Sequence, residues 1–250
     1  MEDLQISVAI PVGPAPHHRR WLGECLDSVF NQTYPADEIL IIDDQAHLDR
    51  NGELLKIAGR EYDYFSSNSS GVHTHLAEDP NLPELNYYKT PWLSGVAHAF
   101  NCGVSLAYNE WVVLLGSDDR LYPNALERAA KAIRETNDPL GWFNFACHIS
   151  STGQVVNWYN NAGVASKALW RKTGGYHPMT VTGGMDAALH SVLMAHMPEH
   201  QHAIEYGTPL YWVRMHDHNY TRESTARYGE FVVQLRNDLT AEWQEPEWTK

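Results

Sequence analysis

The chain has few cysteines, few basic residues and no long apolar segment, and each shortage argues against a class of protein. Its three cysteines, Cys25, Cys102 and Cys147, lie far apart without paired spacing, which disfavours a disulfide framework or a cysteine-based zinc cluster. Eighteen lysines and arginines against 31 aspartates and glutamates give a net charge of -13, which disfavours a general nucleic-acid or anionic-membrane surface. No run approaches the roughly 18 apolar residues that a spanning helix needs, so we expect no integral membrane association.

The bulk composition is that of an ordinary soluble protein, with 43% hydrophobic and 20% charged residues. The acidic start Met1-Glu2-Asp3 has no apolar segment typical of a secretory signal, so we expect a cytoplasmic protein. Without an internal repeat or a low-complexity linker, we expect one domain over 1–250. Its parts are a first half (5–135), a second half (136–222) and a C-terminal helix with an acidic tail (223–250).

The first half alternates strand and helix patterns, which predicts an α/β fold with a mostly parallel, Rossmann-like sheet and flanking helices. Apolar runs predict strands at 6–11, 38–42, 62–66 and 111–115. Helical spacing predicts helices near 18–32, 48–59 and 96–107, with another opened by Pro123. Residues 67–91 are polar and rich in turn formers, which favours a loop or insertion with at most a short strand near Tyr87.

The second half has a mixed pattern and predicts a smaller, less regular region. Residues 142–149 and 155–159 alternate around a Ser-Thr-Gly turn and predict an aromatic β-hairpin. We expect helices near 163–172 and 184–196, a strand at 210–215, and a C-terminal helix marked by Phe231, Val232, Leu235 and Leu239. His196, His200 and His202 have suggestive metal-ligand spacing, but Pro198 interrupts the helix that would align them, so we favour a solvated turn over a zinc site.

Two acidic pairs end apolar strands. Asp43-Asp44 follows 38–42, and Asp118-Asp119 follows 111–115. Carboxyl ends of parallel strands share one edge of a sheet, so the two pairs can line one crevice. Adjacent carboxylates repel each other unless a cation or a proton compensates, which points to a metal. The alternative is structural, because acids after strands often cap the next helix or form a turn.

The order of several motifs resembles family 2 glycosyltransferases of the GT-A fold. The resemblance covers roughly residues 5–135 and is looser beyond them. The segments that carry it are Ile6–Val12, Trp21–Pro35, Glu38–Asp44, Asn101–Val104 and Leu114–Asp119, followed by Pro123.

The resemblance implies roles for individual residues of this chain. A nucleotide-sugar donor would contact Pro11, Val12, Asp43, Asp44, Asn101, Ser117 and Asp118, with Asp43 and Asp44 at the nucleoside. Asp118, Asp119 and His216 would hold Mg²⁺ or Mn²⁺, which neutralises the diphosphate as it leaves.

Asp186 follows Gly183-Gly184-Met185 and matches the position of the catalytic base in that family, which takes the proton of the acceptor hydroxyl. The structural alternative is that Asp186 only stabilises a helix N-terminus. His216 follows Arg214-Met215 where the family often has Arg-x-His, although a structural role is equally open for one of 14 histidines.

Five residues depart from the family pattern. Gly13 stands where an aromatic or polar residue is usual, and Gln45-Ala46 replaces the usual Gly-Ser. Phe100 stands where an arginine often precedes the asparagine, and Gly116 replaces the first acid of the fuller acidic motif. These departures affect the expected base and diphosphate contacts but leave two carboxylates for a metal.

The expected function is therefore a metal-dependent, inverting glycosyltransferase of the hexosyltransferase type, with a UDP-sugar as the favoured donor. A sugar nucleotidyltransferase is one alternative, but residues 12–20 contain one glycine and no lysine with which to grip a triphosphate. A non-catalytic sugar-nucleotide-binding module is another. The acceptor stays open among a saccharide or other hydroxyl-bearing molecule and a modified DNA base. The net charge disfavours DNA, although Lys167, Arg171 and Lys172 form a small basic patch.

Overall fold

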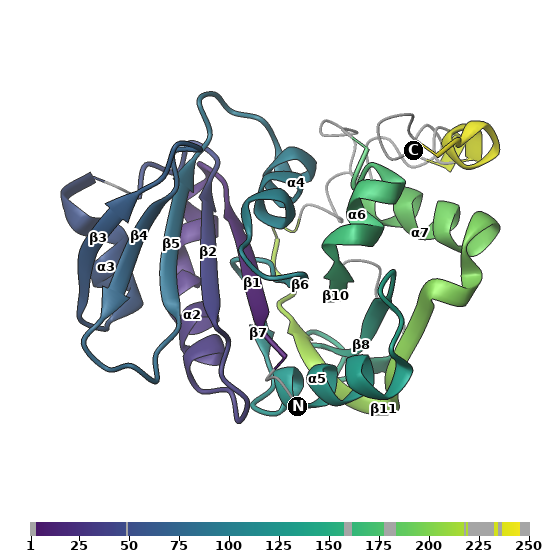
Figure 1. Cartoon of the computed structure of the whole chain (residues 1–250), viewed down its shortest axis with the longest axis horizontal. Helices are drawn as coiled ribbons and strands as arrows, with labels where there is room; N and C mark the ends of the chain where they lie inside the picture. Colours follow the sequence, from purple (N-terminus) through teal and green to yellow (C-terminus); the bar gives the residue numbers. More distant parts are fainter. Residues whose placement is uncertain are drawn as a thin grey trace.

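One mixed sheet runs through the chain and carries helices on both faces (Figure 1). The computed structural model describes residues 4–48, 50–157, 162–177, 184–217, 219, 233–234 and 237–245. Within these residues the sheet has eleven strands in the order β3-β4-β5-β2-β1-β6-β10-β8-β11-β7, and β9 pairs with β8 beside this path. The expected α/β class with flanking helices is confirmed, and the sheet is a mixture of parallel and antiparallel pairs.

The strands are β1 (Ile6–Val12), β2 (Glu38–Asp43), β3 (Tyr62–Ser67), β4 (His73–Ala77), β5 (Glu84–Lys89), β6 (Trp111–Leu114), β7 (Arg120–Leu121), β8 (Trp142–Ile149), β9 (Val155–Val156), β10 (Gly163–Ser166) and β11 (Gln201–Val213). The α-helices are α1 (Pro16–Arg20), α2 (Leu22–Phe30), α3 (Glu53–Ala58), α4 (Val96–Leu106), α5 (Ala125–Thr136), α6 (Lys167–Thr173) and α7 (Met185–His196), with short 3-10 turns at Arg50–Gly52 and Pro198–His200.

The centre of the sheet is parallel, as the first half of the sequence predicts. β1 pairs with β2 and β6, and β5 pairs with β2, all in parallel. One apolar core packs α2, α3 and α5 on one face, and a second packs α4, α6 and α7 on the other. The helix α4 lies so close to β1 that a Cβ on Gly103 would be 2.8 Å from the Cβ of Ala9. Gly103 therefore permits the close approach that places α4 against the central strands.

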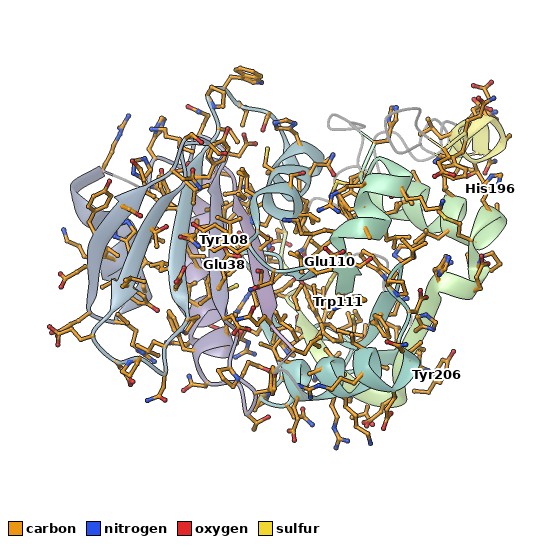
Figure 2. The ribbon with its side chains drawn as sticks, in the orientation of Figure 1. Glu38, Tyr108, Glu110, Trp111, His196 and Tyr206 are labelled. Atoms are coloured by element: carbon orange, nitrogen blue, oxygen red, sulfur yellow. The ribbon has the colours of Figure 1, made fainter. Side chains whose placement is uncertain are left out.

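The expectation of a loop or insertion over 67–91 is wrong, because β4 and β5 lie within it. β5 reads as polar because its buried Asn86 serves a buried carboxylate on the next strand. Glu38 at the start of β2 accepts hydrogen bonds from Asn86 Nδ2 at 2.7 Å, Ser7 Oγ at 2.6 Å and the N–H of Tyr108 at 2.8 Å. Figure 2 shows Glu38 and Tyr108 side by side. Burial raises the pKa of Glu38.

The helix expected over 163–172 begins later than predicted. Residues 163–166 form β10, which runs antiparallel between β6 and β8, and α6 starts only at Lys167. A short run of small apolar residues fits a buried strand as well as a helix, so its periodicity does not decide between them. The expected hairpin is present as β8 and the short β9, but Trp158 and Tyr159 lie outside the described residues.

The strand expected at 210–215 is longer than predicted and begins at Gln201. His202 of the expected solvated turn therefore lies in the sheet, and His200 ends the short turn just before the strand. His200 Nδ1 and His202 Nε2 lie 2.9 and 2.7 Å from the same carboxylate oxygen of Asp138. Pro209 lies at a register shift between β11 and β8, which lets the strand continue through an irregularity.

Near the C-terminus, residues 233–234 and 237–242 are helical, while Phe231, Val232 and Leu235 of the expected helix lie outside the described residues. In the part of the chain that the structure describes, no helix combines the length and apolar character needed to span a bilayer.

Candidate functional site

The parallel strands bring the predicted site residues to one edge of the sheet. β1, β2, β5 and β6 run in the same direction, so Val12, Asp43, Asp44 and the residues after Leu114 lie at their shared carboxyl edge. In open α/β sheets this edge is where ligands bind. Residues 116–119, here named the acid loop, follow β6 at this edge.

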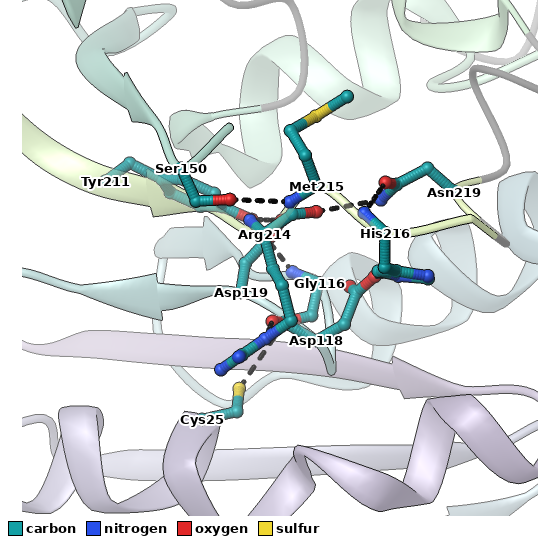
Figure 3. A network of polar contacts seen from close by, with 10 residues as sticks. All are labelled: Cys25, Gly116, Asp118, Asp119, Ser150, Tyr211, Arg214, Met215, His216 and Asn219. Carbon is teal, nitrogen blue, oxygen red and sulfur yellow. Dashed lines mark hydrogen bonds and ion pairs between the residues drawn. The ribbon is translucent and has the colours of Figure 1, made fainter. Parts of the chain in front are cut away.

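The last residue of the acid loop, Asp119, is held by residues at the end of β11 and directly after it (Figure 3). Its Oδ2 accepts a hydrogen bond from the hydroxyl of Tyr211 at 2.8 Å, and its Oδ1 accepts one from the N–H of Arg214 at 2.8 Å. The same Tyr211 hydroxyl accepts a hydrogen bond from the N–H of Gly116 at 3.0 Å. One buried phenol therefore fixes both ends of the acid loop.

The neighbouring Asp118 faces a different set of groups. Its Oδ2 lies 3.0 Å from His216 Nε2, and its carbonyl accepts a hydrogen bond from Arg214 Nε at 2.8 Å. The Asp118 side chain keeps 22% of its surface exposed, whereas burial, reinforced by the charge of Asp118, raises the pKa of Asp119 well above its usual range. A cation beside this pair would favour the ionised form of both.

Gly116 leaves the space into which both carboxylates point. A Cβ on residue 116 would lie 2.9 Å from Asp119 Oδ2 and 3.1 Å from Asp118 Oδ1. The residue that departs from the fuller acidic motif is thus the one that lets these two oxygens converge. Below it, the buried Cys25 donates to the Gly116 carbonyl, with its Sγ at 3.4 Å.

The side chains of the acid loop and His216 could hold a divalent metal together with a bound ligand. Within the described ranges, no three His, Cys, Asp or Glu side chains are arranged to hold a metal ion by themselves. Mg²⁺ sites of phosphate-binding enzymes are commonly built from one or two carboxylates completed by substrate phosphates and water. The metal ligands that the protein could contribute here are Asp118 and His216, with Asp119 behind them. Oxygen ligands suit Mg²⁺ or Mn²⁺, and imidazole suits Mn²⁺.

Asp43, the first member of the other acidic pair, is a buried structural acceptor. Its carboxylate receives the N–H groups of His47 at 3.0 Å and Leu48 at 2.7 Å, and the Tyr87 hydroxyl at 2.7 Å. These contacts fix the turn that leaves β2. The predicted contact of Asp43 with a nucleoside stays a prediction.

Asp44 holds the segment between β5 and α4. Its Oδ1 accepts from Thr90 Oγ1 at 2.9 Å and from the N–H of Ser94 at 2.7 Å, and its Oδ2 accepts from the N–H of Gly95 at 2.7 Å. Gln45 follows in the left-handed region at φ 67°, where the family pattern has glycine, and its amide donates to the Thr90 carbonyl. Asp44 therefore shapes this part of the edge whether or not it also touches a ligand.

The remaining residues predicted to contact the sugar-nucleotide donor lie on β1, in the acid loop and on α4. The side chain of Val12 is fully buried, and its carbonyl accepts the N–H of Asp44 at 2.9 Å, so the strand end holding Pro11 and Val12 lies beside the acidic pair. Ser117 is 5% exposed within the acid loop. Asn101 on α4 is bound to the chain itself, since its side chain bridges Trp170 Nε1 and both backbone groups of Tyr176.

Asp186 lies in the first turn of α7, as predicted. Its Oδ1 accepts the N–H of Ala187 at 2.9 Å, and burial raises its pKa while the nearby His190 lowers it. The carboxylate also acts electrostatically on the buried Tyr176, which Asn101 anchors to α4. No contact among the described residues joins Asp186 to the acid loop. The N-terminal helix position that both interpretations of Asp186 require is observed.

Sequence reasoning missed Tyr211 and His18. Tyr211 is buried in β11 near the predicted His216, but nothing in its immediate sequence points to Asp119. His18 is partly buried on α1, and the charges that act on it are those of Asp118, His216 and Asp44. The unusual Gly13, five residues earlier, was the available signal for His18, because a Cβ there would be 2.5 Å from the ring.

The family model described as Glycosyl transferase family 2 matches residues 7–177. Glycosyltransferase GlyG of Streptococcus pneumoniae is 26% identical over 148 residues, which are 59% of this chain and 41% of GlyG. An uncharacterized glycosyltransferase of Rickettsia felis is 29% identical over 138 residues, 55% of this chain and 18% of that protein. The chain thus spans less than half the length of these relatives.

Two solved structures share the fold. Residues 1–349 of S. aureus TarS in complex with UDP-GlcNAc superpose with a TM-score of 0.67 at 14% identity, over 97% of this chain and 68% of that one. Mannosyltransferase PcManGT from Pyrobaculum calidifontis, in complex with GDP-Man and Mn²⁺, gives a TM-score of 0.64 at 17% identity, over 97% of this chain and 66% of that one. The GT-A type of architecture expected from the sequence is confirmed by these matches.

Proposed function

The chain belongs to glycosyl transferase family 2, and on that premise we propose that it transfers a sugar from a nucleoside-diphosphate donor to an acceptor hydroxyl. The observation that carries the proposal is the acid loop, where two carboxylates converge over Gly116 beside an imidazole at the ligand-binding edge of the sheet. The ligands of the fold relatives, UDP-GlcNAc and GDP-Man, are donors of this chemical class.

Asp118 and His216 would hold a divalent metal, Mn²⁺ or Mg²⁺, together with the donor diphosphate. When bound, such a metal neutralises the charge that develops on the leaving nucleoside diphosphate. Asp119 keeps the acid loop in place through Tyr211 and Arg214 and adds negative charge behind the metal. The strand end at Val12, together with Asp43, Asp44 and the turn that Asp44 holds, would form the nucleoside end of the donor site. We favour UDP as the nucleotide.

Asp186 is the proposed base of an inverting reaction. A carboxylate whose pKa is raised by burial is better matched to accepting a proton from a hydroxyl near neutral pH. The helix α7, which carries Asp186, packs in one apolar cluster with α4, and Asn101 of α4 holds Tyr176 of the same cluster. The acceptor is a hydroxyl-bearing molecule, with a saccharide favoured and a DNA base disfavoured by the charge of -13.

The test separates donor binding from transfer. Wild-type protein is titrated calorimetrically with UDP-GlcNAc, UDP-glucose and GDP-mannose, each with MnCl₂ or MgCl₂, and the best donor is offered to an acceptor panel. We expect Asp118→Asn to lose metal-dependent nucleotide binding. Asp186→Asn should keep binding but lose at least about a hundredfold in transfer. Asp63→Asn, an exposed acid on β3, is the matched control.

The product stereochemistry tests the inverting mechanism, because NMR of the anomeric proton shows whether the configuration at C1 changes. Absence of nucleotide binding by the wild type would overturn the donor assignment. Unchanged turnover by Asp186→Asn would overturn the assignment of the base alone. Metal-dependent hydrolysis of the donor without an acceptor would reject a purely binding role.

A further inference from the structure

His18 lies at the donor edge but has no role in the site described above. It belongs to α1, which follows β1 after the unusual Gly13. The three charged or titratable groups that act on its imidazole are Asp118 of the acid loop, His216 and Asp44. His18 is therefore close to both acidic pairs, which come from two different strands.

The His18 ring fills the space that a side chain on residue 13 would need. A Cβ on Gly13 would lie 2.5 Å from His18 Nδ1 and 2.7 Å from its Cε1, distances at which one of the two groups must move. Residue 13 directly follows Val12 at the end of β1. The imidazole thus stands at the strand end where the family pattern has an aromatic or polar side chain.

The two nitrogens of the His18 ring differ in their surroundings. Its Nδ1 is buried against Gly13, and a second ring, that of His17, lies with its centroid 4.3 Å away. Among the described residues, none forms a hydrogen bond with His18 Nε2. An imidazole nitrogen can donate to a phosphate or ribose oxygen, so Nε2 has the chemistry to bind such a ligand at this edge.

We infer that His18 is a donor-binding residue, whose ring takes the place of a side chain on residue 13 and contacts the nucleoside diphosphate between Asp44 and Asp118. This inference rests on the proposed function, because it needs a nucleotide at this edge. It explains the pairing of Gly13 with His18, since any larger residue at position 13 would displace the ring.

Two substitutions probe the same ring from opposite sides. His18→Ala removes the imidazole, and Gly13→Ala pushes it away while leaving it in the chain. The atoms that a new Cβ would meet belong to a side chain that can turn aside, so Gly13→Ala should fold normally. The matched control is His75→Ala on β4, because His75 is a partly buried histidine on a strand at the other side of the sheet.

The experiment is calorimetric titration of the full chain with UDP and with GDP, each in the presence of MnCl₂, with melting temperatures recorded for every variant. We expect His18→Ala and Gly13→Ala each to weaken binding of the preferred nucleotide by about tenfold, a typical loss for a hydrogen bond to a charged group. His75→Ala should bind as the wild type does. In the double variant the losses should not add, because both substitutions remove the same contact.

A rescue variant completes the test. In Gly13→Tyr with His18→Ala, a ring is again present at the strand end, and we expect at least part of the lost affinity to return. Wild-type binding that is unchanged in both His18→Ala and Gly13→Ala would overturn the inference while leaving the proposed function intact. Failure of the wild type to bind either nucleotide would overturn the proposed function itself.

Discussion

Tyr211 provides the sharpest test of how the acid loop is built. Its side chain is 1% exposed, and its hydroxyl donates to Asp119 Oδ2 while accepting from the N–H of Gly116. Tyr211→Phe removes both hydrogen bonds and adds no group that could replace them. A hydrogen bond to a charged group contributes about 1.5–3 kcal/mol and a neutral one about 1 kcal/mol, so we expect a loss of about 2–4 kcal/mol in the free energy of unfolding.

Urea denaturation followed by circular dichroism measures this loss, and a drop of roughly 5–15 °C in melting temperature should accompany it. The control is Tyr122→Phe, which removes a half-buried phenol hydroxyl 2.7 Å from His148 Nδ1 and should cost about 1 kcal/mol. Manganese-dependent UDP binding should weaken in Tyr211→Phe only. If Tyr211→Phe unfolds within about 0.5 kcal/mol of the wild type, the hydroxyl does not hold the loop and the reasoning fails.

Two further predictions concern the buried carboxylate of Glu38 and the close packing of the loop carboxylates at Gly116. Because burial raises the pKa of Glu38, ionisation disfavours the folded state, and stability from this group is lost as pH rises above its usual value of 4.5. Glu38→Gln should therefore gain stability relative to the wild type as the pH rises above 4.5, with the Asn86 amide turned over so that its unpaired Oδ1 accepts from the new amide; a flat difference in urea unfolding would contradict this. Gly116→Ala should force the loop carboxylates apart and weaken UDP–Mn²⁺ binding severalfold in calorimetry. The control is Gly23→Ala on α2, where a Cβ would make only an ordinary 3.6 Å contact with the Ile57 carbonyl oxygen, and this variant should bind normally. If Gly116→Ala bound UDP–Mn²⁺ as tightly as Gly23→Ala does, the close packing at Gly116 would be refuted.

The parallel centre of the fold could be predicted because its strands are apolar on both faces. Runs such as 38–42 and 111–115 leave few alternatives to buried strands, and the acids after them mark the ligand edge. β5 could not be found this way, because its buried Asn86 looks polar in sequence and is stabilised only by Glu38 on the neighbouring strand. Tertiary pairing of polar groups is invisible to a pattern that counts apolar positions.

The sheet edge of the candidate site could be predicted from the sequence, but the hydrogen bonds among its residues could not. Asp43, Asp44 and Asn101 lie where the motifs predict, and each also has hydrogen-bond partners within the chain that the motifs do not reveal. A motif specifies which residue types gather at an edge. It does not specify whether a carboxylate accepts N–H groups from its own turn or faces a ligand, because that depends on loops that are distant in sequence.

The acid loop shows why this distinction matters for interpreting mutants. Asp119 is bonded to Tyr211 and Arg214, which join the acid loop to the end of β11, so replacing it disturbs the fold as well as any metal. Asp118 has a partly exposed carboxylate beside His216, and its tie to Arg214 uses only its backbone carbonyl. A substitution of the Asp118 side chain can thus remove the proposed metal ligand without releasing the loop. Loss of activity in an Asp119 variant therefore reports on catalysis only after its loss of stability has been measured, whereas the corresponding Asp118 variant tests the proposed metal binding directly.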